Sequence, residues 1–429
     1  MNRFLKCGWI ASLIPMLFLF GSVDPGFSKT AKAKPPRTRE AQVGQTRPTV
    51  PGSQGGLQCN AQSAILMDGL TGQVLYEQNS KERIAPASFV KVMTLYLIYD
   101  ALRAGQMKTD DLVTVSENAW KRAWKTDGSK MFIKVGERVK VEDLMKGVAI
   151  ASGNDACVAL AEHLSGAEET FVSKMNEKAK ALGLNDSQFR NPDGLPADGQ
   201  YITAMDMATL ARRYIEDHPE ALALHSTTEF EYNGIRQGNR NTLLQKNIGV
   251  DGLKTGHVKE SGYHLVATAK REGQRLIAVV MGCDKFRKRG PEAEKLLEYG
   301  FKNFSTVEAV KKGASFGPVK VKRGKVGEIT LVAAEEGKIT VPKGKEGTVS
   351  VITQLPPFVE APIEKGKVLG KVLIQNEGKV IKEVPLLSSS EVLKSLLPPW
   401  PVIGAVLLGL AFVGSGGMWW MKRRKARRY

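Results

Sequence analysis

A serine and a lysine separated by two residues, Ser88 and Lys91, are the pair whose types and spacing best fit covalent catalysis. A serine hydroxyl is a poor nucleophile until a base removes its proton. On a helix, a lysine three residues further along lies on the same face and within side-chain reach. Pro86 and the apolar stretch 89–104 predict that Ser88 opens such a helix, whose positive end favours a neutral lysine. The pair therefore predicts a nucleophilic serine with Lys91 as its base.

Two polar elements follow further along the chain, Ser152-Gly153-Asn154 and Lys254-Thr255-Gly256. Taken alone, the first is typical of a turn with a capping asparagine, and the second is typical of a strand end. After a serine–lysine pair, however, they complete an ordered S-x-x-K, S-x-N and K-T-G set. The three elements together therefore favour one active site over three unrelated features.

This set resembles the penicillin-binding protein and serine β-lactamase superfamily, and it is most similar to the low-molecular-mass D-alanyl-D-alanine carboxypeptidases. The resemblance covers roughly residues 58–307. It implies an α/β, β-lactamase/penicillin-binding-protein-like transpeptidase fold, in which an antiparallel sheet has helices on both sides and a helical subdomain. Further stretches that carry the resemblance are 130–132, 151–156, 191–195, 250–257 and 262–269.

The resemblance also implies a role for each polar side chain of the set. Ser88 would attack the carbonyl of the penultimate D-alanine and form an acyl-enzyme, while Lys91 would take its proton. Ser152 would relay a proton to the departing D-alanine, and Lys254 would keep that hydroxyl polarised. Asn154 would hydrogen-bond the peptide and fix the scissile carbonyl.

The remaining implied contacts hold the carbonyl oxygen and the terminal carboxylate. The backbone N–H groups of Ser88 and His257 would form the oxyanion hole, a task that depends on position rather than on side-chain identity. Thr255, next to Gly256, would grip the terminal carboxylate together with Arg289. The segment that carries Arg289 departs from the family pattern, so its neighbours at 287 and 288 (Arg and Lys) remain rivals for this role.

The sequence predicts no metal site and no cofactor. His163, His218 and His225 lack metal-ligand spacing, and no phosphate-binding glycine loop occurs. The aromatic residues form no nucleic-acid platform, so we expect no nucleic-acid partner. The partners that the resemblance implies are peptidoglycan pentapeptide stems as substrate and β-lactam antibiotics as covalent inhibitors.

The two ends of the chain indicate export and membrane anchoring. Arg3 and Lys6 precede a short apolar core, which is typical of a secretory signal peptide, although an uncleaved anchor stays open. Residues 400–421 contain no charge and are long enough to cross a bilayer. Six cations follow, as the positive-inside rule expects of a cytoplasmic tail. We therefore expect a protein anchored in the cytoplasmic membrane, with its catalytic domain on the outer side.

Composition and hydrophobic patterning divide the rest of the chain. A stretch rich in Pro, Lys, Arg, Gln and Gly predicts a disordered tether, and short Val/Ile runs between Gly and Pro predict a small all-β domain. Export leaves three cysteines whose pairing is open. The segments are a signal peptide (1–28), a tether (29–56), a D,D-carboxypeptidase catalytic domain (57–304), the all-β domain (305–387), a linker (388–399), a transmembrane helix (400–421) and a basic tail (422–429).

Within the catalytic domain the pattern changes from a strand hairpin to helices and back to strands, which indicates a layered domain with an antiparallel sheet. Strands are expected at 64–68, 73–77, 262–271 and 275–282, and helices at 88–104, 141–151, 155–164, 167–182, 203–217 and 291–304.

Three alternatives remain open at this point. A β-lactamase shares the three elements, but no Glu-x-x-Leu-Asn that would supply a deacylating carboxylate precedes Asn191. A D,D-endopeptidase also shares them and differs in the amide that it cuts. A murein-binding or penicillin-sensing module would need no catalysis, and the intact serines and lysines argue against it.

Overall fold

The structure is a computed structural model that describes residues 56–396 and 400–426. The expected signal peptide and all but the last residue of the expected tether lie outside the described residues. So do 397–399 of the expected linker and the last three residues of the chain.

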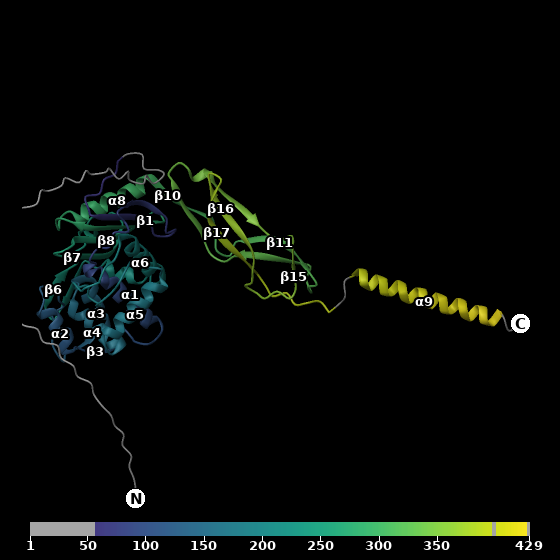
Figure 1. The fold of residues 1–429 in the computed structure, drawn as a ribbon, viewed down its shortest axis with the longest axis horizontal. Helices are drawn as coiled ribbons and strands as arrows, with labels where there is room; N and C mark the ends of the chain where they lie inside the picture. The colour runs from purple at the N-terminus through teal and green to yellow at the C-terminus, as the bar shows by residue number, and fades with distance from the viewer. Residues whose placement is uncertain (1–55, 397–399, 427–429) are drawn as a thin grey trace, which may run out of the picture. The chain divides into compact units, whose positions relative to one another are not determined.

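A five-stranded antiparallel sheet forms the centre of the first domain, in the order β2-β1-β9-β8-β7 (Figure 1). Strands β8 and β9 form a hairpin, and β1 pairs with β9 from the other end of the domain. Both faces of β9 are covered, which explains its long apolar run. The expected antiparallel sheet is thus confirmed. The strands are β1 (Ser63–Asp68), β2 (Val74–Gln78), β7 (Val250–Val258), β8 (Gly262–Arg271) and β9 (Gln274–Cys283).

Alternate residues of these strands enter two different hydrophobic clusters, as the two-residue period of a strand requires. Ile65 packs in the cluster that contains the helices α1 (Val90–Arg103) and α6 (Ala204–Asp217). Its neighbour Leu66 packs in the other cluster, against α8 (Arg289–Asn303). Helices therefore cover both faces of the sheet (Figure 1).

Along the chain, a helical region lies between strands β2 and β7 of the sheet. It differs at several points from the helices that the sequence predicts. The helix expected at 141–151 divides into α3 and a π-helical turn, Gly147–Ala151. Ser88 lies in a 3-10 turn, Ala87–Phe89, rather than in the first turn of α1. The region holds α2 (Glu117–Trp124), α3 (Val141–Lys146), α4 (Asn154–Ser165), α5 (Glu168–Ala181) and α7 (Ala221–His225), with the hairpins β3/β4 (Leu112–Thr114 and Arg138–Lys140) and β5/β6 (Glu229–Tyr232 and Ile235–Gly238).

Two further sheets form the small all-β domain that the sequence predicts. One pairs β10 with β13, and the other has the order β14-β16-β17-β12-β11-β15. Buried Val392 bridges to Ile363, so the ordered domain continues into the segment expected to be a linker from 388. The strands are β10 (Phe304–Val310), β11 (Ser315–Lys322), β12 (Glu328–Ala333), β13 (Gly337–Pro342), β14 (Val349–Gln354), β15 (Phe358–Glu360), β16 (Val368–Asn376) and β17 (Lys379–Ser388).

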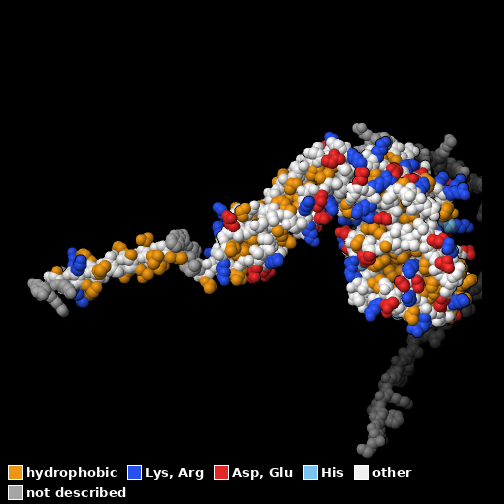
Figure 2. Space-filling model, turned by 180° about the vertical axis from the view of Figure 1, so that it is seen from behind, with side chains coloured by type: hydrophobic (Ala, Val, Ile, Leu, Met, Phe, Trp, Pro, Cys, Tyr) orange, Lys and Arg blue, Asp and Glu red, His pale blue; other side chains and the backbone are white. Residues whose placement is uncertain are grey.

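A single helix, α9 (Trp400–Ala426), follows this domain. Its segment Val402–Arg424 has a mean hydropathy of 1.8 and is long and apolar enough to cross a membrane. Figure 2 shows hydrophobic side chains along its surface and Lys and Arg side chains toward one end. The apolar helix agrees with the expected span at 400–421.

Candidate active site

The turn that carries Ser88 is fixed by a loop from a distant part of the chain. Ala87, directly before the serine, has a φ of 49°, a left-handed conformation that is uncommon for alanine. A Cβ atom at Gly194 would overlap the carbonyl oxygen of Ala87, and Gly194 itself has a φ of 83°. Only glycine meets both conditions, so the loop at Asn191-Pro192-Asp193-Gly194 packs directly on the turn.

Lys91 lies one turn after Ser88 and contacts it directly. Lys91 Nζ is 3.0 Å from Ser88 Oγ and 2.7 Å from Asn154 Oδ1, and it also donates to the carbonyl oxygen of Asp193. The side chain is fully buried, and burial lowers the pKa of Lys91 below its usual 10.5. A lysine with a lowered pKa can be neutral and accept the proton of a nearby hydroxyl.

Ser152 completes a short hydrogen-bonded chain. Its Oγ donates to Ser88 Oγ over 3.1 Å. Ser152 ends the π-helical turn with a φ of 62°, and such left-handed non-glycine residues are concentrated at functional sites. The neighbouring Asp155 carboxylate accepts from the backbone N–H of Met131 (2.8 Å) and Phe132 (3.0 Å), which fixes the adjoining loop.

Strand β7 brings the third element to the site. Lys254 is buried, and burial together with the positive charge of Lys91 holds its pKa well below 10.5. Thr255, Gly256 and His257 line a cavity of about 380 Å³ that also contains Ser88, Ser152 and Asn154. The structure therefore gathers all three sequence elements at one place.

Of the three cations considered for the carboxylate contact, only Arg289 lines this cavity. Its guanidinium donates to the carbonyl oxygens of Gly256 (3.4 Å) and Arg240 (3.2 Å). Burial, aided by the charge of Arg240, lowers the pKa of Arg289 to about 10. Lys288 instead pairs with Asp284 over 2.8 Å at the surface.

Arg240 is a cavity residue that the sequence analysis missed. It lies in the loop after β6, where its side chain donates to Ser129 Oγ. No spacing relates it to the three elements, so the sequence offered no signal for it. Arg240 and Arg289 bring two guanidinium groups to the same cavity, which suits a substrate with a terminal carboxylate.

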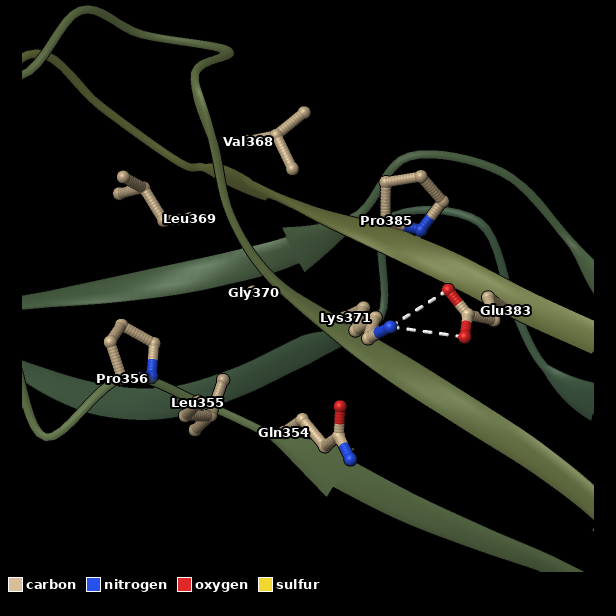
Figure 3. A pocket seen from close by; sticks show the side chains of 9 residues that line it. All are labelled: Gln354, Leu355, Pro356, Val368, Leu369, Gly370, Lys371, Glu383 and Pro385. Carbon is tan, nitrogen blue, oxygen red and sulfur yellow. Dashed lines mark hydrogen bonds and ion pairs between the residues drawn. The ribbon is translucent and has the colours of Figure 1, made fainter. Parts of the chain in front are cut away.

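A second cavity, of about 600 Å³, lies in the all-β domain (Figure 3). Lys371 and Glu383 pair across it over 2.9 Å, and Leu355 and Val368 are among its apolar wall residues. None of the residues that line it carries a hydroxyl, a thiol or an imidazole. This cavity therefore offers no serine or cysteine nucleophile, and its lysine and glutamate are paired with each other, so the acyl-transfer chemistry belongs to the cavity at Ser88.

The described residues contain no group of three or more His, Cys, Asp or Glu side chains that could hold a metal ion. His225 is buried and bonded to the Leu253 carbonyl oxygen over 2.9 Å, and burial lowers its pKa to about 3. His218 is buried beside Asp100 at 2.8 Å. Both imidazoles act as packing residues.

A serine in contact with a buried lysine and a second serine, beside a cavity lined by two arginines and on an antiparallel sheet covered by helices, is the arrangement of an active-serine acyl-transfer enzyme. Family comparisons agree with this class. Residues 46–285 match the model of the D-alanyl-D-alanine carboxypeptidase family, and residues 304–394 match that of the penicillin-binding protein 5 C-terminal domain.

Individual relatives are similar over most of the chain. D-alanyl-D-alanine carboxypeptidase DacC of Escherichia coli is 44% identical over 76% of this chain and 83% of its own length. DacF of Bacillus subtilis is 39% identical over 78% and 86%. The crystal structure of penicillin-binding protein 5 from Haemophilus influenzae has a TM-score of 0.74 and 40% identity, and the match covers 79% of this chain and 99% of that one.

The chain belongs to the D-alanyl-D-alanine carboxypeptidase family of low-molecular-mass penicillin-binding proteins. Its activity is that of a serine-type D-Ala-D-Ala carboxypeptidase. The expected fold, enzyme class and activity are confirmed. The family match favours a carboxypeptidase over a β-lactamase.

Proposed function

We propose that Ser88 is the nucleophile and that Lys91 is its base. Neutral Lys91 takes the hydroxyl proton while Ser88 Oγ forms a bond to the carbonyl carbon of the penultimate D-alanine. The 3.0 Å contact between the two side chains supports this step more directly than any other observation. Asn154 orients Lys91 and the substrate peptide. Its Oδ1 contacts Lys91, and its side chain lines the cavity that receives the peptide.

Ser152 then carries the proton to the leaving group. The C–N bond breaks, the amine of the terminal D-alanine gains a proton through Ser152, and an ester of Ser88 remains. Lys254, buried and with a lowered pKa, polarises the Ser152 hydroxyl. Water hydrolyses the ester and restores Ser88, so that one D-alanine is released for each water consumed.

Charge and backbone groups stabilise the reacting ends of the substrate. The N–H groups of Ser88 and His257 bind the developing oxyanion, since β7 packs beside the turn of Ser88. Thr255 and Arg289 bind the terminal carboxylate, and Arg240 adds positive charge to the same cavity. The N–H groups thus bind the charge that develops on the carbonyl oxygen, and the side chains bind the charge that the carboxylate already carries.

The substrate is the pentapeptide stem of peptidoglycan, and β-lactams acylate the same serine. A structure of penicillin-binding protein D2 from Listeria monocytogenes in its ampicillin-bound form is 32% identical, with a TM-score of 0.53. We place the catalytic domain outside the cytoplasmic membrane, held by α9, with the basic tail inside. The hydropathy of α9 and the cations after it support this orientation.

Product analysis tests this proposal. Detergent-solubilised full-length protein is incubated with pentapeptide muropeptides, and mass spectrometry should find tetrapeptides and free D-alanine. Ser88→Ala should release none and should not be labelled by fluorescent penicillin. Labelling of Ser88→Ala at the wild-type level, with the adduct on another serine, would refute the assignment of the nucleophile.

A further inference from the structure

Phe286 is an exposed aromatic side chain at the mouth of the active-site cavity. It follows β9 in the segment Lys285-Phe286-Arg287-Lys288, and 46% of its surface is exposed. Single exposed apolar residues are common on protein surfaces. Phe286 differs from these because it lines the same cavity as Ser88 and Thr255.

The ring is held in place by two neighbours that are themselves in the site. The guanidinium carbon of Arg289 lies 4.4 Å from the ring centre, which is a cation–π contact. Tyr263 meets the ring edge-on at 6.1 Å, and it also stacks on His257 at 4.1 Å. His257, Tyr263 and Phe286 therefore form one aromatic wall that leads from β7 to Arg289.

We propose that Phe286 determines specificity by limiting the size of the residue on the leaving-group side of the scissile amide. The inference rests on the proposed function, in which Arg289 binds the carboxylate of that residue. The ring leaves room beside Arg289 for the methyl group of D-alanine. It excludes the longer side chain of a diamino acid that cross-links two stems.

The chemistry of the two substrates leads to this assignment. A pentapeptide and a cross-link both present a D-alanyl carbonyl, and in both the leaving amine can carry a neighbouring carboxylate. The nucleophile, the oxyanion hole and the carboxylate contact therefore cannot distinguish them. They differ in the bulk beside the carboxylate, where Phe286 lies against the guanidinium of Arg289. A rigid aromatic ring restricts that bulk with little loss of conformational entropy.

Two substrates measured side by side test the inference. The full-length protein and its Phe286→Ala variant are given a monomeric pentapeptide muropeptide and a cross-linked tetrapeptide dimer of the meso-diaminopimelate type. We expect Phe286→Ala to raise the ratio of dimer cleavage to D-alanine release by about tenfold or more, the scale of steric selection in enzyme pockets. Phe286→Tyr keeps the ring and should keep the wild-type ratio.

A matched control lies in the all-β domain. Phe358 is 44% exposed and carries a cation, Lys322 Nζ, 3.2 Å from its ring centre. Phe358→Ala therefore removes a similar aromatic–cation pair away from the site and should leave the ratio unchanged. Labelling by fluorescent penicillin confirms that each variant is folded, and Phe286→Leu replaces the alanine variant if it is not labelled.

The outcomes separate this inference from the proposed function. If Phe286 only supports Arg289, the alanine variant loses activity on both substrates and the ratio stays constant, which overturns the inference alone. A wild-type protein that cleaves the dimer and spares the pentapeptide contradicts the proposed function itself.

Discussion

Arg122 lies 3.3 Å from the carboxylate of Asp193, and the carbonyl oxygen of the same Asp193 accepts a hydrogen bond from Lys91. The guanidinium also binds both oxygens of Glu168, at 2.7 and 2.6 Å. An ion-pair network from α2 and α5 thus holds the backbone that contacts the proposed base. Arg122 is a positioning residue, since it reaches the reacting groups only through Asp193.

Replacing Arg122 with Met should lower kcat by about tenfold to a hundredfold, the effect expected when a reacting group is misplaced. Burial lowers the pKa of Lys91, the negative charge of Asp193 partly opposes that lowering, and the positive charge of Arg122 offsets Asp193. Without Arg122 the acidic limb of the pH–rate profile should therefore move to higher pH. Arg83→Met removes a surface pair with Asp186 (2.7 Å) and serves as the control. If kcat falls but the acidic limb of the pH–rate profile does not move, Arg122 has a purely structural role.

The pH dependence of acylation should follow the buried lysine. Burial lowers the pKa of Lys91 from 10.5, and only its neutral form can accept the proton of Ser88. The rate of labelling by fluorescent penicillin should therefore rise with pH through a midpoint below 10.5 and then level off. Lys91→Arg should be nearly inactive at every pH, because a guanidinium stays protonated. A midpoint at or above 10.5 would contradict a neutral lysine base.

The serine, the lysine and the second serine could be predicted because they are encoded as short motifs. Ser88 and Lys91 need only one helical turn to meet, and Ser152 and β7 join them as the family resemblance implies. The sequence did not show that Ser152 would require a π-helical turn, because the apolar run 147–151 has an ordinary helical pattern. Such a turn results from packing, which periodicity does not record.

Other parts of the site could not be predicted, because they act from loops or through the backbone. The Asp193 contact with Lys91 uses a carbonyl oxygen, which every residue type possesses. Arg240 and Phe286 reach the cavity from loops whose path depends on the whole domain. In the same way, five-residue α7 is too short for a helical period to be recognised.

Gly194 should tolerate no side chain. An added Cβ would overlap the Ala87 carbonyl oxygen beside the nucleophile, and the φ of 83° adds strain. Gly194→Ala should therefore lose most penicillin labelling and should lower the melting temperature. Gly183→Ala is the matched control, because Gly183 has a similar φ of 76° but no atom within 4 Å of an added Cβ. Gly183→Ala should lower the free energy of unfolding only by the backbone strain of a left-handed alanine, about 1–3 kcal/mol, and should keep its labelling by penicillin. If penicillin labels the two variants equally, the overlap with the Ala87 carbonyl oxygen does not disturb the nucleophile.

The last prediction concerns the attachment of the enzyme to the membrane. Residues 402–421 carry no charged side chain on any face of the helix, and their described side chains are exposed almost throughout. An amphipathic helix lying on a surface would instead have one polar face, so this composition favours a span. Removal of residues 398–429 should release the protein from membranes and leave D-alanine release from small peptides unchanged. Removal of 422–429 alone keeps the apolar helix and should leave the protein in the membrane fraction. Extraction of the full-length protein by high salt or alkaline carbonate would show peripheral attachment, and the spanning helix would then be wrong.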